Sequence, residues 1–350
     1  MKTLKVGVIG CGVIGRKHIE AAVALPHVEL VAIADVSEVA LKEVAAQFGV
    51  DRTYMSAEEL LQDRSIDAVV LALPTSIRGK LALEALNQGK HLLLEKPAGM
   101  HAAELERLQE AQTNQVIACA SSRFALYDSA LEAANVVASG VLGELRLIRC
   151  RALIPAKPAP SVLPPAWRLN RSMNGGGILL NWGVYDLDYL FSLTGWQLKP
   201  ETVLAQTWTV PETFGPHVAP NSDAETYVSA FIRCEGGVVI SFERGEYMAT
   251  VQDEAWQIVG EAGSLRLRMV PDRPKELLLD KADGQRGIMT KTVWQGEETY
   301  QTIHSLPLEN FATAILEGLE PATTLERALQ MQRLTDAIYA SADEGRAVTL

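Results

Sequence analysis

Near its amino terminus the chain reads Val6-Gly7-Val8-Ile9-Gly10-Cys11-Gly12-Val13-Ile14-Gly15, a short apolar run that leads into a G-x-G-x-x-G pattern. The pattern predicts a buried strand, a tight turn and a helix start. Gly10 permits the turn, Gly12 lets the backbone approach a phosphate, and Gly15 lets the helix pack against the strand. The first N–H groups of a helix bind anions such as pyrophosphate. We therefore assign to a dinucleotide site Gly10, Cys11, Gly12, Val13, Ile14 and Gly15.

The segment after this turn supports the same interpretation. Residues 28–34 read as a second buried strand, and Asp35 follows it directly, where a ribose-binding acid is expected. Its carboxylate would accept hydrogen bonds from ribose hydroxyls and repel a 2′-phosphate. Because no Arg or Lys follows until Lys42, we expect NAD to be preferred, with NADP as the alternative cofactor. The other interpretation of Asp35 is that it only caps the next helix.

Length and composition narrow the class of protein. A chain of 350 residues, 48% of them hydrophobic, is long enough for two domains with separate cores. The net charge of −11 argues against a nucleic-acid or anionic-membrane partner. We expect a cytoplasmic protein, because the first strand begins too early for a signal peptide and no apolar run approaches the roughly 20 residues of a membrane span.

The four cysteines are widely scattered, without a C-x-x-C or a nearby His pair, so the sequence predicts neither a zinc site nor a disulfide framework. Cys11 lies within the predicted phosphate turn. It is either a small filler or a thiol open to alkylation.

The pattern of apolar residues differs between two parts of the chain. Residues 1–122 alternate helical patterns with solid apolar strands, which predicts an α/β domain with a parallel sheet covered on both faces. Residues 123–350 carry longer strands with period-two alternation, which predicts an α+β domain around an open, largely antiparallel sheet. A free sheet face favours burial by a second copy, so we expect a homo-oligomer. Candidate residues for that face are Val238, Ile240 and Phe242.

Glu95-Lys96-Pro97 follows the apolar run of residues 91–94. Lys96 therefore lies at the carboxyl end of a strand, where open α/β sheets bind their ligands. Pro97 could carry a cis peptide bond that directs Lys96. The alternative for Lys96 is an ordinary solvated side chain.

A second polar cluster lies in residues 175–188, which begin with three glycines. The glycines suit either a close backbone approach or a flexible crossing. If a helix begins near Asn181, then Asn181, Tyr185 and Asp188 lie on one face, with spacings of four and three residues. Such a stripe is either a site or a polar helix surface. Apolar residues supply the buried side of that helix, namely Leu187, Leu190, Phe191 and Leu193.

These segments in this order resemble the glucose-fructose oxidoreductase and inositol dehydrogenase family (Gfo/Idh/MocA). The resemblance also includes Arg123-Phe124, residues 139–144 and the closing residues 341–350. It implies a Rossmann domain, doubly wound around a parallel sheet, and a second domain whose open sheet mediates dimers or tetramers. It implies NAD(P)-linked oxidation or reduction of sugars, cyclitols or related alcohols. The family's usual Lys, Asp and His then fall on Lys96, Asn181 and Tyr185. We also assign Pro74, Glu95 and Lys96 to the cofactor site.

Two of these three positions differ from the usual pattern. Tyr in place of His occurs in the branch that resembles glucose-fructose oxidoreductase and dihydrodiol dehydrogenase, so Tyr185 keeps an acid–base role. Asn181 in place of Asp removes a negative charge that would raise the pKa of a neighbouring lysine by roughly 1 to 3. We expect Tyr185 to accept the proton, Lys96 to hold the substrate oxygen and Asn181 to orient a neighbouring hydroxyl. The pocket wall would include Arg123, Trp167 and Arg168, while Trp167 and Trp182 either stack on a sugar or pack in the core.

Two other classes of function remain open at this stage. A nucleotide or sugar sensor would use the same fold without turnover. A lyase, hydrolase or sugar–sugar oxidoreductase would keep NAD bound and use it transiently.

Overall fold

The computed structural model describes residues 2–350, and the chain divides into two compact units. Unit 1 comprises the residues up to Arg123 together with Gln301–Gln332, and unit 2 comprises Phe124–Tyr300 and Arg333–Leu350. Within residues 2–350, no helix combines the length and the apolar character that crossing a membrane would need.

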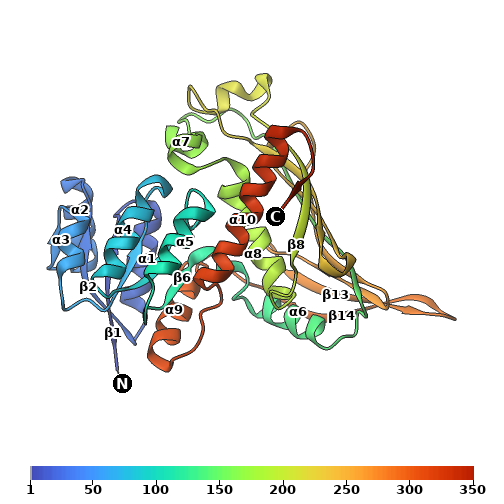
Figure 1. Ribbon diagram of the computed structural model, residues 1–350, viewed down its shortest axis with the longest axis horizontal. Helices are drawn as coiled ribbons and strands as arrows, with labels where there is room; N and C mark the ends of the chain where they lie inside the picture. Colours follow the sequence, from blue (N-terminus) through green and yellow to red (C-terminus); the bar gives the residue numbers. More distant parts are fainter. Residues whose placement is uncertain (1) are drawn as a thin grey trace. The chain divides into compact units, whose positions relative to one another are not determined.

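Unit 1 contains a six-stranded sheet in the order β3-β2-β1-β4-β5-β6, with every neighbouring pair parallel. Figure 1 shows these strands among their helices at the blue to cyan end of the colour scale. The strands are β1 (Leu4–Ile9), β2 (Val28–Ala34), β3 (Thr53–Tyr54), β4 (Ala68–Leu71), β5 (His91–Leu94) and β6 (Ile117–Cys119). The first five helices are α1 (Val13–Ala24), α2 (Glu38–Phe48), α3 (Ala57–Gln62), α4 (Thr75–Asn87) and α5 (Ala102–Ala111). The predicted parallel sheet is therefore confirmed.

Both faces of this sheet are covered, which explains its solid apolar strands. One core packs α1 and α2 against β1, and the other packs α3, α4 and α5 against β4 and β5. The local signals in the sequence match local structure: Ser56 caps α3 by accepting the N–H groups of Glu58 and Glu59, and Gly49 ends α2 with a φ of 67°.

Unit 1 also contains Gln301–Gln332, a segment that the sequence predicted to belong to the second domain. In α9 (Ser305–Glu317), Leu308 and Phe311 are fully buried in the core that contains β1. The first residues of α10 (Leu325–Glu344) bury Leu325 and Leu329 in the opposite core. The physical reason is that these apolar side chains complete the two faces of the parallel sheet.

Unit 2 contains a nine-stranded sheet in the order β14-β13-β12-β11-β7-β10-β9-β8-β15. Strands β7 and β10 pair in parallel and the other neighbouring pairs are antiparallel, so the predicted largely antiparallel sheet is confirmed. Figure 1 shows the β13–β14 hairpin extending beyond the rest of this sheet. The strands are β7 (Leu145–Pro155), β8 (Pro200–Trp208), β9 (Tyr227–Cys234), β10 (Val239–Met248), β11 (Asp253–Gly260), β12 (Gly263–Leu267), β13 (Lys275–Asp283), β14 (Gly287–Gly296) and β15 (Val348–Thr349).

The helices of unit 2 are mostly short. They are α6 (Asp128–Ala138), α7 (Arg171–Asn174), the π-helix η3 (Leu179–Gly183), α8 (Val184–Leu193) and the later part of α10, with short 3-10 turns at η2 (Ala166–Leu169), η4 (Glu212–His217) and η5 (Glu235–Gly237). The 3-10 turn η1 (Ala120–Phe124) belongs almost wholly to unit 1. The predicted buried side of α8 is confirmed, because Leu187, Leu190, Phe191 and Leu193 are all buried.

The choice of free sheet face was wrong for the residues named. Ile240 and Phe242 are fully buried, and the Phe242 ring approaches Gly183 of η3. They therefore face this chain's own helices, and Val238 lies just before β10 and is half-buried. The exposed face instead carries Leu204 and Phe231, each 52% exposed.

Candidate active site

The glycine turn of unit 1 depends on close backbone approaches. A Cβ atom on Gly15 would lie 1.8 Å from the Gly10 carbonyl oxygen, and one on Gly10 would lie 2.3 Å from the Ala72 carbonyl oxygen. Gly10 also has a φ of +101°, a conformation that favours glycine. A Cβ on Gly12 would meet nothing within 4 Å, so the turn is open there. The turn therefore fits a bound pyrophosphate at the start of α1.

Asp35 lies at the carboxyl end of β2 and touches this turn. Its carboxylate accepts the Cys11 N–H at 2.6 Å and the Ser37 N–H at 2.8 Å. A carboxylate has about four acceptor positions, so these bonds leave capacity for ribose hydroxyls. Cys11 itself is buried, and burial together with the nearby Asp35 charge raises its pKa to about 12. This favours the small filler over a reactive thiol.

One cation near the turn was not predicted from the sequence. Arg16, on α1, donates from Nε to the Cys11 carbonyl at 3.3 Å, and its guanidinium pairs with Glu43 at 2.9 Å. Arg16 precedes Asp35 in the sequence, whereas Lys42 follows Asp35 and pairs with Glu38 at 2.6 Å.

Glu95 is the centre of a buried charged cluster in unit 1. One carboxylate oxygen lies 2.8 Å from His18 Nε2 and 2.7 Å from Arg123 Nη2, and the other accepts the Lys96 backbone N–H at 3.1 Å. Burial alone would raise the pKa of Glu95, but the Arg123 guanidinium, His18 and Lys96 outweigh it and hold that pKa well below its usual value. Glu95 is therefore ionised and fixes the backbone that carries Lys96.

Arg78 on α4 holds the same backbone from the other side. Its buried guanidinium donates to the carbonyl oxygens of Glu95, at 2.6 Å, and of Pro97. The Lys96–Pro97 peptide bond is cis. The sequence offered no signal for Arg78, which lies 17 residues before Glu95. Pro74 follows β4 and occupies the N-cap position of α4.

Arg123 was expected in the pocket wall, but its guanidinium is used inside unit 1. It is 3% exposed, pairs with Glu95 and lies 3.2 Å from His304 Nδ1. Burial and the Arg123 charge lower the pKa of His304 to about 4, so the ring is neutral at pH 7 and accepts from Arg123. The structural role of Arg123 is thus to hold Glu95.

In unit 2, Asn181 and Tyr185 lie on η3 and α8. The helical segment begins at Leu179 as a π turn, two residues before the predicted start, and Asn181 is half-buried. Tyr185 is 6% exposed and packs edge-on against Phe124 and Trp182, with ring centroids 5.3 and 5.7 Å apart. The third residue of the predicted stripe, Asp188, is fully buried and accepts a hydrogen bond from Ser192, so it is not part of an open polar face.

The Trp182 ring is supported by the side chain of Arg244. The buried Arg244 guanidinium lies 4.8 Å from the Trp182 ring and 3.5 Å from the carboxylate of Asp186, which also accepts the Trp256 indole N–H at 2.9 Å. Asp186 therefore pairs with Arg244 and is itself held by Trp256, and the cation–π contact of Arg244 supports the Trp182 ring beside Tyr185. The sequence suggested Trp182 but not its support.

The remaining candidates of unit 2 lie on η2. Trp167 is 45% exposed. Arg168 pairs with Glu246 at 2.5 Å and donates to the Tyr247 hydroxyl at 3.2 Å. Its charge is thus already balanced within the unit.

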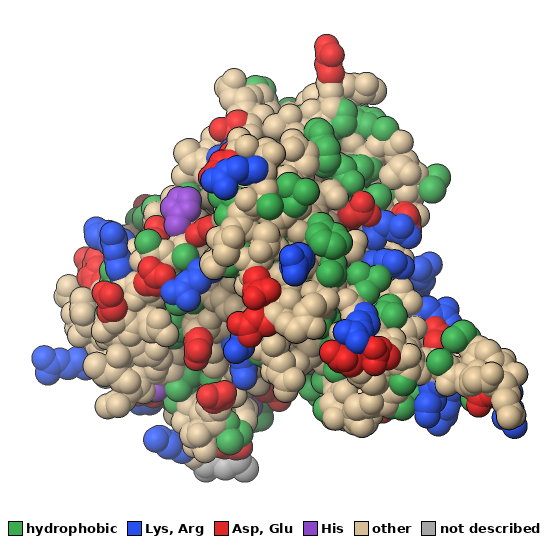
Figure 2. Space-filling model, turned by 45° about the vertical axis from the view of Figure 1, so that its right-hand side comes forward, with side chains coloured by type: hydrophobic (Ala, Val, Ile, Leu, Met, Phe, Trp, Pro, Cys, Tyr) green, Lys and Arg blue, Asp and Glu red, His purple; other side chains and the backbone are tan. Residues whose placement is uncertain are grey.

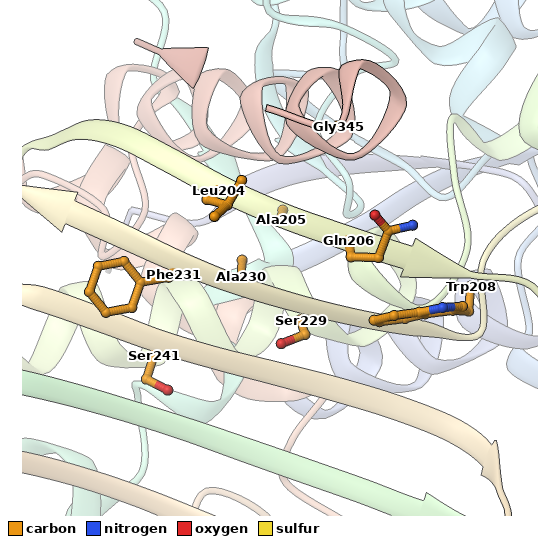
Figure 3. Close-up of a pocket in the computed structure, with 9 residues that line it drawn as sticks. All are labelled: Leu204, Ala205, Gln206, Trp208, Ser229, Ala230, Phe231, Ser241 and Gly345. Carbon is orange, nitrogen blue, oxygen red and sulfur yellow. The ribbon is translucent and has the colours of Figure 1, made fainter. Parts of the chain in front are cut away.

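A hollow of about 440 Å³ opens on the exposed face of the nine-stranded sheet and contains none of the predicted site residues. Figure 3 shows Leu204, Phe231 and Ser241 on three neighbouring strands, with Trp208 farther along β8. The other residues that line it are Ala205, Gln206, Ser229, Ala230 and Gly345.

Comparison with known proteins places these features in a family. Residues 4–120 match an oxidoreductase family with an NAD-binding Rossmann fold, and residues 130–266 match the GFO/IDH/MocA C-terminal domain. Myo-inositol 2-dehydrogenase of Thermotoga maritima is 26% identical over 99% of this chain and 98% of its own length. A dTDP-3,4-didehydro-2,6-dideoxy-alpha-D-glucose 3-reductase of Streptomyces violaceoruber is 30% identical over 76% of this chain and 73% of its own length.

Among solved structures, levoglucosan dehydrogenase in complex with NADH and L-sorbose has the same fold, with a TM-score of 0.85 and 23% identity over 100% of this chain and 99% of that one. The family matches cover both units of the present structure. The chain therefore belongs to the Gfo/Idh/MocA family of NAD-binding oxidoreductases.

Proposed function

We propose that this NAD-dependent oxidoreductase transfers a hydride between the nicotinamide and a carbinol or carbonyl carbon of a sugar, a cyclitol or a related compound. The observation that carries the proposal is the shared sheet edge in unit 1. The glycine turn, Asp35 and Lys96 all follow the carboxyl ends of strands in one parallel sheet. Open α/β sheets bind their ligands at that edge. The names of the relatives, which include inositol and deoxysugar enzymes, support the substrate class.

The residues of this chain handle the proton. When bound, NAD supplies or accepts the hydride. The Tyr185 tyrosinate oxygen takes the proton of the substrate alcohol, and in the reverse direction the Tyr185 hydroxyl gives a proton to the oxygen of a ketone or aldehyde. The Lys96 ammonium holds the substrate oxygen and favours the tyrosinate form of Tyr185. The Asn181 carboxamide orients a neighbouring hydroxyl group. Trp182, supported by Arg244, forms an apolar wall, and we also assign Trp167 and Arg168 to the pocket wall.

A substrate panel tests this function against its alternatives. Sugars, cyclitols and keto-sugars are offered with NAD⁺ or NADH, and absorbance is followed at about 340 nm, where only the reduced nicotinamide absorbs. The proposal expects steady accumulation or consumption of NADH with at least one substrate. Product formation without net NADH would indicate transiently used, bound NAD, and ligand binding without any product would indicate a sensor.

The roles of Tyr185 and Lys96 predict a large loss of rate. Tyr185→Phe should lower kcat at least about a hundredfold, because a general acid or base typically contributes 10²–10⁴-fold. Lys96→Met should abolish turnover. Initial rates on the best panel substrate provide the measurement. NADH affinity of the Tyr185→Phe variant is the control and should be unchanged, since the glycine turn and Asp35 lie in unit 1. A Phe variant with a near-normal rate would remove Tyr185 from the proton transfer.

Asp35 predicts the choice of nucleotide. NADH should bind more tightly than NADPH, because the Asp35 carboxylate would face the added phosphate while the Arg16 guanidinium is held by Glu43. Asp35→Ser should reduce the preference and leave Arg16 as the nearest cation. Fluorescence titration with both nucleotides measures it. Equal affinities in the wild-type protein would show that Asp35 does not contact the ribose.

Asn181 predicts a shift in pH dependence. Asn181→Asp adds a negative charge, which stabilises the protonated forms of Lys96 and Tyr185 and raises both pKa values. Every limb of the kcat/KM profile that reports these groups should therefore move to higher pH, by about one unit for a partly screened pair. Asn181→Ala is the matched control and should leave the limbs in place. An unshifted profile in the Asp variant, with unchanged KM, would place Asn181 outside the site.

We further propose that the exposed sheet face binds a second copy of the chain. Phe231 lies across from Leu204 and Ser241 on the neighbouring strands, and Trp208 adds a half-exposed indole to the same face. Figure 2 brings the side of this sheet forward and shows hydrophobic side chains between Lys and Arg. A contiguous exposed apolar patch of this kind favours an interface.

Sedimentation velocity should therefore show a dimer or a larger assembly, and Phe231→Glu should shift it toward the monomer because it buries a charge in the interface. Val39→Glu, at a 68% exposed position on α2, is the control and should not change the assembly. A monomeric wild-type protein at micromolar concentration would contradict this interface.

A further inference from the structure

The start of η3 is bound by a single buried glutamate. Glu225 lies two residues before β9 and is 3% exposed. One carboxylate oxygen accepts the Gly177 N–H at 2.8 Å, the other accepts the Leu179 N–H at 3.0 Å, and its backbone carbonyl accepts the Ile178 N–H at 2.9 Å. Three consecutive N–H groups thus end on one residue, which satisfies the donors that a helix start leaves without partners.

These hydrogen bonds continue directly into the segment that carries the proposed site residues. The Gly177 carbonyl accepts the Asn181 N–H at 2.9 Å, and the Leu179 carbonyl accepts the Val184 N–H, one residue before Tyr185. The two residues whose N–H groups the carboxylate accepts, Gly177 and Leu179, are therefore the residues whose carbonyls accept the N–H groups of Asn181 and Val184. Short π turns of this kind occur often at functional sites.

The glycines before η3 are explained by the same contact. A Cβ on Gly177 would lie 1.8 Å from the Glu225 carbonyl oxygen, and one on Gly176 would lie 1.9 Å from the Tyr339 hydroxyl oxygen. Of the two interpretations of these glycines, the close backbone approach is the one that the structure requires, since any larger residue would push the chain away from Glu225.

Tyr339 touches the same carboxylate, and its hydroxyl also interacts with the Gly177 backbone N–H. Its hydroxyl donates to the Glu225 oxygen that also accepts from Leu179, at 2.8 Å. Burial raises the pKa of Glu225, and the backbone N–H groups and the Tyr339 hydroxyl oppose that effect. The cluster therefore contains two side chains, of which Glu225 accepts three N–H groups of the turn and Tyr339 contacts only that of Gly177.

We propose that Glu225 is a positioning residue for the reaction: its carboxylate and carbonyl fix where η3 begins and thereby direct Asn181 and Tyr185. This inference rests on the proposed function, which gives those two side chains their roles. It predicts that loss of an acceptor at Glu225 lowers kcat out of proportion to its effect on stability, because small misplacements of reacting groups are costly.

The experiment compares two variants of the same cluster. Glu225→Gln keeps the shape but replaces one acceptor oxygen by an N–H₂ group, so one of the two N–H groups loses its partner. Tyr339→Phe removes one donor from the carboxylate and one contact with the Gly177 N–H, and leaves the three N–H bonds to Glu225. Both should lower Tm by similar amounts. We expect kcat to fall roughly 10- to 100-fold in Glu225→Gln and to stay within about twofold in Tyr339→Phe, with NADH affinity unchanged in both.

A double-mutant cycle then tests the route of the effect. In a Tyr185→Phe background, Glu225→Gln should cause a smaller further loss of kcat than in the wild-type protein, because one of the two groups that it positions is already missing. Equal losses of kcat in the two single variants, or a fully additive loss in the double variant, would overturn the proposal. Glu225→Asp replaces the Gln variant if the latter does not fold: it keeps the charge but is too short to reach both N–H groups.

Hydrogen exchange gives a reading that does not need turnover. The amides of residues 177–185 should exchange faster in Glu225→Gln than in the wild-type protein, and should stay protected in Tyr339→Phe. Unchanged protection in Glu225→Gln would refute the positioning role. If the two variants show this exchange pattern but the wild-type protein turns over no panel substrate, the proposed function alone is refuted.

Discussion

The start of a helix leaves backbone N–H groups without partners, and the two units of this protein meet that demand in opposite ways. In unit 1 the glycine turn opens at Gly12, where an added Cβ would meet nothing within 4 Å, so an anion can approach the start of α1. In unit 2 the chain supplies the acceptors itself, because the Glu225 carboxylate accepts the N–H groups of Gly177 and Leu179 and its backbone carbonyl accepts that of Ile178. The first start is suited to binding a cofactor, and the second to fixing side chains.

The charges around Lys96 form a second constraint on the structure. In the proposed site, Asn181 replaces the Asp of the usual family pattern and so removes one negative charge. Within unit 1, Glu95 is ionised, accepts the Lys96 backbone N–H and is influenced by the Lys96 charge. Arg123 and His18 contact the same carboxylate, so one buried anion holds several segments of unit 1 together.

The sequence predicted those features whose signals are local. The strand, turn and helix around Gly10–Gly15, the cap at Ser56 and the strand before Glu95 each depend on neighbours within a few residues, and all were recognisable. The partners of Glu95 and of the glycines were not, because His18 lies 77 residues from Glu95 and Gly177 lies 48 residues from Glu225. The buried face of β10 was misjudged because period-two alternation marks two faces without showing which one the helices cover.

The central claim is that a hydride passes directly between a substrate carbon and the nicotinamide. The most direct measurement uses the best panel substrate deuterated at the carbon that is oxidised, with NAD⁺ and the full-length protein, and mass spectrometry of the nucleotide. The account predicts NADH that carries one deuterium, formed more slowly than unlabelled NADH from the unlabelled substrate. Unlabelled NADH, or deuterium recovered in solvent, would contradict it.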